Sequence, residues 1–424
     1  MEPFTDLVLL IGTNPLPNFV VAEYFLKDNN ALQNIWLIHS EEAVSIRQLG
    51  TGVQAENLEI ILQTRHNGKG KLSFPLKKVS LSNASNAQSI LNDIKEKFIK
   101  KLTNNCSVHL NYTGGTKAMG THVYRAIEQV ENIKKSFSYL DGRNFQIISD
   151  ENGIINQNDL RSEVQITFEE LIKLHGFKRK NTDDNHDFSE AVCKFRKLID
   201  EGRLDEYFQT DGGYNRNLFE NIKKVGELAT KINELKCELK NYTAKGALLS
   251  IAQSMPEGYQ IFNDKGEFLA PQTKNICKYA IRFLDGTWLE EYVYVILGEV
   301  LRDDTSIKIE KNWVIDKKGW TTDFEIDVPV LKGYQLIGIS CTTSDDKYIC
   351  KSKGFEIIHR TKQIGGDEAK AILITRANVT KRDNLQKELE INTGITSGNI
   401  LVLGENDLKS NTLREYIASF IHQD

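Results

Sequence analysis

The stretch Asn111-Tyr-Thr-Gly-Gly-Thr-Lys-Ala-Met119 comes directly after a short apolar run, Ser107–Leu110. Paired glycines let an anionic group approach the backbone, threonines offer hydroxyl groups, and Lys117 adds a positive charge. In an open parallel sheet, ligands bind beyond the carboxyl ends of the strands, where helix N-termini present N–H groups. The stretch is therefore predicted to be the ligand-gripping loop of a Rossmann-like domain, with a phosphorylated ligand.

Two other expected strands of this region also end in polar residues. Gly12-Thr13-Asn14 follows the run Leu7–Ile11, and His39-Ser40 follows Ile35–Ile38. Apolar runs that alternate with amphipathic helices indicate a parallel sheet, so the three ends are expected to meet at one edge. The glycine spacing fits neither a Walker A loop nor a dinucleotide fingerprint, which disfavours triphosphate hydrolysis. A plain strand-to-helix turn at Gly114-Gly115 remains the alternative.

The chain divides into three predicted parts of an α/β protein. The polar stretch Ser149–Asn158 ends the first part, so residues 1–150 are expected to form the sensor domain. Residues 151–275 are expected to be a mostly helical connector. From residue 276 to residue 424 the order is helix, three meandering strands, helix and strand, which predicts a separate effector domain.

Composition narrows the class of protein. The net charge of −4 and the pI near 6.1 disfavour a protein that coats nucleic acid with a broad basic face. The six cysteines form no CxxC pair, so neither a zinc site nor a disulfide framework is expected. The N-terminus lacks the features of a signal peptide and no window reaches the length of a membrane span, which predicts a cytoplasmic protein without membrane contact.

A family resemblance covers nearly the whole chain. Leu10-Ile-Gly-Thr-Asn-Pro-Leu-Pro17, the loop Asn111–Met119 and Ser138-Tyr-Leu-Asp-Gly142 resemble the CARF sensor of a two-domain family of CRISPR-associated nucleases. Ile166–Gly176 and Leu284-Asp-Gly-Thr-Trp-Leu-Glu290 are also similar to that family. The resemblance implies a Rossmann-like CARF domain, a helical connector and a C-terminal restriction-endonuclease-like domain of the PD-(D/E)xK type.

The resemblance also implies a ligand and a partner. In that family a homodimer of sensor domains binds cyclic oligoadenylate, commonly cyclic tetra-adenylate, made by type III CRISPR complexes, and this activates the nuclease. A cyclic oligoadenylate with two-fold symmetry suits a two-fold symmetric dimer, because the dimer interface brings the same ligand loop from each subunit to the ring. The expected ligand-binding residues of each subunit are Gly12, Thr13, Asn14, Ser40, Thr113, Gly114, Gly115, Thr116 and Lys117.

In the effector part, a PD-(D/E)xK core needs carboxylates for Mg²⁺ or Mn²⁺ and a lysine for the attacking water. Asp323-Phe-Glu-Ile-Asp327 would place three carboxylates on one strand face by period-two alternation. The resemblance identifies Asp327 as a metal ligand and Glu290 as the helix glutamate. A solvated helix charge is the alternative for Glu290.

The next strand departs from the family pattern. Ser340 and Thr342 occupy the positions of the usual Glu and Lys, and hydroxyl groups neither balance a metal's charge nor supply a cation. Two explanations stay open: the nuclease is inactive, or Lys353 and Glu356 on the following helix replace the missing groups. Glu356 would then join Asp327 and Glu290 at the metal, and Lys353 would orient the water. An ordinary exposed ion pair between Lys353 and Glu356 is the simpler alternative.

Basic residues and tryptophans of the effector part suggest a groove for a single strand. The basic members are Lys311, Lys317, Lys318, Lys347, Lys351, Lys353, Arg360 and Lys362, and the tryptophans are Trp313 and Trp320. Together these features predict metal-dependent cleavage of DNA, RNA or both, including single-stranded and nicked or supercoiled DNA. A ligand-responsive binding protein with a degenerate nuclease site is the second hypothesis. A sensor domain that cleaves its own ligand is the third.

Overall fold

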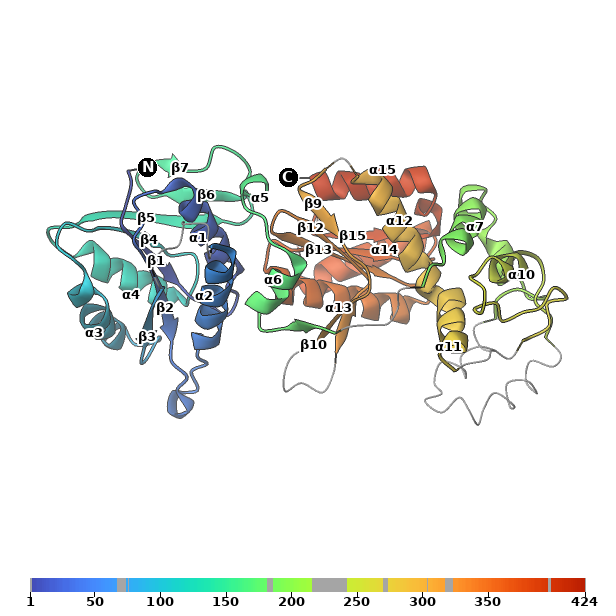
Figure 1. The fold of residues 1–424 in the computed structure, drawn as a ribbon, viewed down its shortest axis with the longest axis horizontal. Coiled ribbons are helices and arrows are strands. Elements are labelled where there is room, and N and C mark those ends of the chain that lie inside the picture. Colours follow the sequence, from blue (N-terminus) through green and yellow to red (C-terminus); the bar gives the residue numbers. More distant parts are fainter. Residues whose placement is uncertain are drawn as a thin grey trace.

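The computed structural model describes residues 2–66, 74, 76–180, 186–215, 242–269, 274–302, 304–316, 323–395 and 398–423. Figure 1 shows the sensor domain at one end of the long axis, the effector domain in the middle, and a group of connector helices at the other end. Among the described helices none is long and apolar enough to cross a membrane.

The sensor domain is built on a seven-stranded sheet with the strand order β3-β2-β1-β4-β5-β6-β7. Strands β1 to β5 pair in parallel, and β5, β6 and β7 are antiparallel. The strands are β1 (Asp6–Leu10), β2 (Asn34–Ser40), β3 (Lys77–Leu81), β4 (Ser107–Asn111), β5 (Lys134–Asp141), β6 (Gln146–Ser149) and β7 (Gly153–Ile154). Because β1 pairs with both β2 and β4, the chain changes direction of winding between β1 and β4, which is where ligands bind in such sheets.

Helices cover both faces of this sheet. Apolar side chains of α1 (Leu16–Asp28) and α2 (Gly52–His66) pack on one face, and those of α3 (Ala87–Lys97) and α4 (Lys117–Glu128) pack on the other. Helix α2 begins only at Gly52, because residues 41–51 form a loop with the short helix η1 (Val44–Ile46). A short helix η2 (Ile99–Lys101) follows α3.

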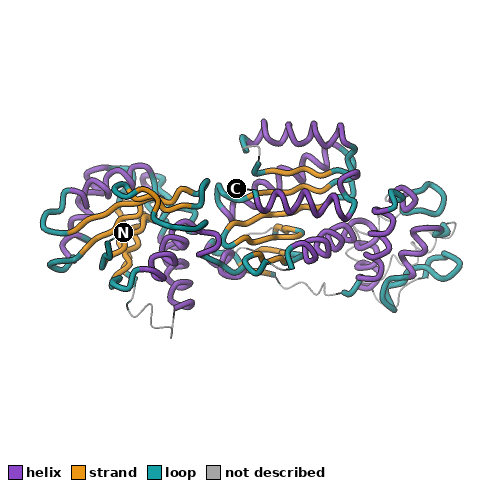
Figure 2. The backbone as a smooth tube through the Cα atoms, turned by 90° about the horizontal axis from the view of Figure 1, so that it is seen from above, coloured by secondary structure: helices purple, strands orange, loops and turns teal. Residues whose placement is uncertain are grey.

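The effector domain contains a five-stranded sheet with the order β15-β14-β13-β12-β9. Its strands are β9 (Ile307–Ile309), β12 (Val328–Lys332), β13 (Gln335–Cys341), β14 (Lys370–Ile374) and β15 (Ile400–Leu403). Helices α13 (Lys347–Gly365) and α14 (Val379–Thr393) pack on one face, while α12 (Trp288–Val300) and α15 (Ser410–His422) pack on the other. The layers are visible from above in Figure 2. The short helix η5 (Glu405–Asp407) precedes α15.

The connector splits between the two ends of the effector domain (Figure 1). Its first part, α5 (Leu160–Glu163), α6 (Phe168–Leu174) and β8 (Lys178–Arg179), lies against the sensor domain and joins β10 (Trp313–Asp316) and β11 (Phe324–Ile326) in a small sheet. Its second part, α7 (Ser189–Asp200), η3 (Leu204–Phe208) and α10 (Gly246–Gln253), packs against α12. Helix α11 (Lys274–Arg282) and the π-helical turn η4 (Phe283–Thr287) lead into α12.

One apolar core joins the sensor domain to the effector domain. It runs from Phe19 and Ile61 through Leu171 of α6 to Trp313 and Ile357. Polar contacts cross the same junction. The guanidinium of buried Arg161 donates to Asp159 and to the Gln335 side chain of β13, and it lies 3.7 Å from the Phe145 ring centre.

Candidate functional site

The predicted ligand loop lies at the carboxyl ends of the neighbouring strands β1 and β4. Close contacts between the two backbone segments require glycine there. A Cβ at Gly114 would overlap the carbonyl oxygen of Leu10, and one at Gly12 would lie 3.1 Å from the nitrogen of Gly115. Gly115 itself has a φ of +75°. The tight-turn alternative is therefore correct as a description of the backbone, and the same turn brings the two loops together.

This turn leaves backbone donors without partners. Within the described residues, the N–H groups of Gly12, Thr13, Gly114 and Gly115 make no hydrogen bond. Thr116 caps α4, its hydroxyl accepting the N–H of Met119 at 3.2 Å. Unpaired N–H groups beside two helix N-termini form a setting that favours anionic groups.

The threonine hydroxyls, by contrast, serve the loop itself. Thr113 Oγ1 donates to Asn111 Oδ1 at 2.7 Å and accepts the N–H of Leu140 at 2.6 Å. Thr116 Oγ1 donates to the carbonyl oxygen of Ala84 at 3.2 Å. Backbone N–H groups and the exposed Lys117 are consequently the groups that this arrangement offers a ligand.

Ser40 and Asn14 also face the protein. Ser40 is buried, and its hydroxyl donates to the carbonyl oxygen of Leu49 at 3.0 Å. Asn14 Oδ1 accepts the N–H of Leu16 at 3.0 Å and meets His175 Nε2 at 3.0 Å. A Cβ at Gly366, the residue that follows α13, would overlap Asn14 Nδ2. Asn14 therefore lies where the sensor loop, the connector and the effector domain touch.

In the effector domain, Asp327 lies at a bend between β11 and β12. Its Oδ2 accepts the Cys341 N–H at 2.7 Å and the Ser340 hydroxyl at 3.1 Å. The predicted single face of three carboxylates is wrong because of this bend: Asp327 turns into the domain, and Asp323 forms an ion pair with Lys180 instead.

Asp327 and Glu290 form an acidic pair under electrostatic strain. Burial is the main cause that raises the pKa of Asp327, and it raises the pKa of Glu290 well above its ordinary range, with the charge of Asp327 as the next cause. Glu290 is therefore not a freely solvated helix charge. Two carboxylates that are costly to ionise together fit a site for a divalent cation.

The charges of Lys353 and Glu356 on α13 both act on the acidic pair. The charge of Lys353 lowers the pKa of both Asp327 and Glu290, and Glu356 raises that of Asp327. Both side chains are described, and no ion pair joins one to the other, so the simple surface-pair alternative is not what the structure contains. Lys351 turns away to Glu388 at 2.9 Å, which leaves Lys353 as the lysine of α13 that acts on the acids.

The metal shell is not fully assembled in this arrangement. Among the described residues, no three His, Cys, Asp or Glu side chains come close enough to hold a metal ion. Glu290 and Asp327 are drawn inward, whereas Glu356 is exposed. The predicted set of Asp327, Glu290 and Glu356 would need Glu356 to approach the other two.

A depression of about 240 Å³ opens onto Glu290 and Thr342. Arg282, which the sequence did not single out, lines it and lowers the pKa of Glu290. The turn of π-helix from Phe283 to Thr287 separates Arg282 from Glu290 along the chain. Such turns often occur at functional sites, but their residues carry no recognisable sequence signal.

The predicted single-strand groove is partly wrong, because one of its two tryptophans belongs to the core. Lys317, Lys318 and Trp320 lie outside the described residues. Trp313 is fully buried and packs against Phe168, so it is a core residue. Four of the other basic side chains are engaged elsewhere: Lys311 pairs with Glu291, Lys347 and Lys351 pair with Glu388, and Arg360 lies over the Phe324 ring.

The fold and the site define a two-domain protein in which a Rossmann-like domain is joined to a nuclease-like α/β domain. Residues 277–399 match the family model described as the Card1-like endonuclease domain, so the effector domain is similar to that family. No curated protein sequence matches the chain significantly.

Two solved structures share the fold over nearly their full length. Can2 from Sulfobacillus thermosulfidooxidans, solved in complex with cyclic tetra-adenylate, has 17% identity and a TM-score of 0.59, with 97% of this chain and 99% of that chain covered. Protein VC1899 from Vibrio cholerae has 15% identity and a TM-score of 0.63, with 98% of each chain covered. The predicted fold class is thereby confirmed, and the match of residues 277–399 supports the predicted resemblance in the effector part.

Substituting Gly114 tests the contact at the ligand edge. Gly114→Ala is expected to lower the free energy of unfolding by about 2 kcal/mol or more, because the new methyl group meets the Leu10 carbonyl. Gly120→Ala on α4, where a Cβ meets nothing within 4 Å, is expected to be neutral or stabilising. Urea denaturation followed by circular dichroism measures both, and equal effects would contradict the close contact.

Asp327→Asn tests the strain in the acidic pair. The folded protein holds the Asp327 carboxyl with a raised pKa, so ionisation costs stability as the pH rises through the ordinary carboxyl range. Without metal, the variant is expected to be more stable than the parent by about 1 kcal/mol at pH 7, and the gain should disappear toward pH 4.

Thermal unfolding with EDTA at the two pH values measures this difference. Added Mn²⁺ should raise the Tm of the parent more than that of the variant, since only the parent keeps both carboxylates. If the variant were instead less stable than the parent at pH 7, and this deficit shrank toward pH 4, Asp327 would stabilise the fold as an anion.

Proposed function

We propose that the protein is a type III CRISPR ancillary effector whose dimeric sensor domain binds cyclic oligoadenylate and thereby activates metal-dependent cleavage of nucleic acid. The observation that carries the proposal is the pairing, in one chain, of an edge with free N–H groups and a Card1-like endonuclease domain with two strained carboxylates. Can2, which shares the fold, was solved with cyclic tetra-adenylate, and this favours that ring as the ligand.

Dimerisation is supported by an exposed apolar patch beside the ligand edge. Val44, Leu49 and Val53 on the loop after β2 and the start of α2 are exposed by 83%, 78% and 63%. Apolar side chains in this number on one short segment favour a protein interface over solvent. A second copy would cover them and present its own loop to a two-fold ligand.

The chemistry proposed for the effector domain is hydrolysis of a phosphodiester. A bound Mg²⁺ or Mn²⁺ ion would supply positive charge to the phosphate and lower the pKa of water. Asp327 and Glu290 would hold the ion, and Glu356 would complete its shell. Lys353 would orient the attacking water, and Ser340 holds Asp327 by its hydroxyl group.

Activation requires that the ligand bind the active arrangement more tightly than the resting one. Asn14 supports a route for this coupling, because it follows the ligand loop and contacts both His175 and the end of α13. Lys353 and Glu356 lie on that same helix. A displacement of the loop would therefore shift α13 relative to Asp327 and bring Glu356 inward.

The second candidate is a ligand-responsive binding protein without nuclease activity. Ser340 and Thr342 in place of the usual charged pair support it, as does the absence of an assembled three-ligand metal shell among the described residues. The strained pair Asp327 and Glu290 argues against it, since a site that has lost its chemistry gains nothing from keeping two acids with raised pKa values.

The test of function is ligand-dependent cutting. Labelled single-stranded DNA, single-stranded RNA and supercoiled plasmid are incubated with the protein and Mn²⁺, with and without cyclic tetra-adenylate. The parent is expected to cut only with the ligand. Asp327→Ala should abolish cutting, and Lys353→Ala should slow it by about a hundredfold or more.

Lys387→Ala on α14 is the control for removal of a lysine from this domain. Ligand binding without any cutting by the parent would favour the binding-protein candidate. Normal cutting by Lys353→Ala would leave the nuclease in place and remove only the role of that lysine.

Asn14→Ala separates ligand binding from activation. We expect the variant to bind cyclic tetra-adenylate within about threefold of the parent, because the Asn14 side chain faces the protein and a contact outside the site contributes little. Activation should fall by about tenfold, a usual size for coupling between sites. Isothermal titration calorimetry and the cutting assay give the two values, and a parallel loss of both would place Asn14 in the ligand site.

A further inference from the structure

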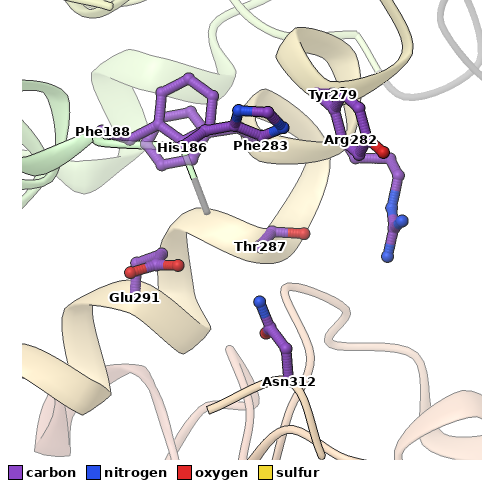
Figure 3. Close-up of a pocket in the computed structure, with 8 residues that line it drawn as sticks. All are labelled: His186, Phe188, Tyr279, Arg282, Phe283, Thr287, Glu291 and Asn312. Atoms are coloured by element: carbon purple, nitrogen blue, oxygen red, sulfur yellow. The ribbon is translucent and has the colours of Figure 1, made fainter. Parts of the chain in front are cut away.

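A narrow recess lies between the connector and the start of α12, and no role has been assigned to it. Figure 3 shows the aromatic rings on one side and Thr287, Glu291 and Asn312 on the other, with Arg282 next to Tyr279. The rings are His186, Phe188, Tyr279 and Phe283, and the polar residues are Arg282, Thr287, Glu291 and Asn312.

The recess lies next to both members of the acidic pair, Glu290 and Asp327. Arg282 and Thr287 line the recess and also the depression that opens onto Glu290. The backbone N–H of Asn312 donates to the carbonyl oxygen of Asp327 at 2.9 Å. A nucleic acid whose scissile phosphate lay at Asp327 and Glu290 would therefore place a neighbouring nucleotide at the recess.

The aromatic wall of the recess has a buried inner part and a half-buried rim. Phe188 and Phe283 are buried and stack with centres 4.3 Å apart. His186 and Tyr279 are half-buried, with ring centres 4.5 Å apart. His186 Nδ1 meets the Tyr259 hydroxyl at 2.8 Å, whereas its Nε2 has no hydrogen-bond partner among the described residues. The rim thus offers π-faces, while the unpaired His186 Nε2 is itself buried.

The size of the recess restricts the class of ligand. Its volume of about 30 Å³ holds one water molecule, so it cannot enclose a cofactor or another small molecule. A flat ring lying across the mouth needs no enclosure, because stacking uses only the face of the aromatic side chain. A nucleobase that extends from a single strand meets this requirement.

The backbone at the polar mouth is held in uncommon conformations. Asn312 has a φ of +53°, which is costly for a residue with a side chain, although asparagine tolerates it better than most. In Figure 3 its side chain points toward Thr287, which ends the π-helical turn after Arg282. Uncommon backbone on two separate segments that face one recess is a frequent mark of a functional site.

We propose that this recess binds the base next to the scissile phosphate of a single-stranded nucleic acid. Tyr279 and His186 stack on the base, the Asn312 amide hydrogen-bonds its edge, and Arg282 contacts the flanking phosphate. The proposal rests on the proposed nuclease function, and it assigns base preference at one position to Asn312.

Asn312→Gly is the decisive variant, because glycine accepts the positive φ and removes only the amide. Activated protein is given oligonucleotides randomised at the positions flanking the cut, and the products are sequenced. The parent is expected to prefer certain bases at one flanking position. The variant should lose that preference, cut the preferred sequence about tenfold more slowly, and unfold at the same temperature or higher.

Asn132→Gly is the matched control, since Asn132 has a φ of +63° on an exposed turn of the sensor domain. It should keep the parent's base preference. A parent without any preference, or an Asn312→Gly variant with the parent's preference, would overturn the assignment to Asn312.

A binding measurement tests the stacking rim independently of cutting. In the Asp327→Ala background with Mn²⁺ and cyclic tetra-adenylate, Tyr279→Ala should weaken binding of a fluorescent single-stranded oligonucleotide by about tenfold. Tyr416→Ala, an exposed tyrosine on α15, serves as the control. Equal binding by the two variants would overturn the rim as a stacking site. A parent that cuts nothing would contradict the proposed function. The binding measurement would still show whether the recess takes part in binding a single strand.

Discussion

The continuous apolar core between the sensor sheet and the effector sheet is the constraint on which the rest of the molecule depends. Phe19 and Ile61 on one side and Trp313 and Ile357 on the other are buried in a single cluster, with Leu171 of α6 between them. Interiors are close-packed and transmit displacement rather than absorb it. Helix α13 lies on this core, so the helix that carries Lys353 and Glu356 is mechanically part of the junction.

Polar groups at the same junction fix how the two domains meet. Buried Arg161 is satisfied by Asp159 and Gln335, and Asn14 links the ligand loop to His175. A buried charge that loses one partner is costly, so these contacts hold one arrangement and penalise others. The junction therefore has the properties that a two-position switch needs: tight packing and few alternative pairings.

Unfavourable groups meet at the effector site, and the strands that support them are regular. Asp327 and Glu290 carry raised pKa values through burial, and Asn312 adopts a left-handed backbone beside them. The strands β12, β13 and β14 that support these residues are regular and buried. A rigid scaffold that holds unfavourable groups in place is the usual arrangement of an active site.

The sequence by itself determined the α/β class, the two glycine-bearing strand ends and the candidate acids, because periodicity and turn chemistry are local. It missed β3, where two lysines hide an edge strand, and α14, whose apolar positions are few. Only the tertiary structure decided that Asn14 and Ser40 face the protein, that Asp327 turns inward at a bend, and that Arg282, Asn312 and His186 meet. Several of those facts depend on bringing together segments far apart in the chain, such as Asn14 with His175 and His186 with Asn312, and no local pattern encodes the direction of a side chain across such a distance.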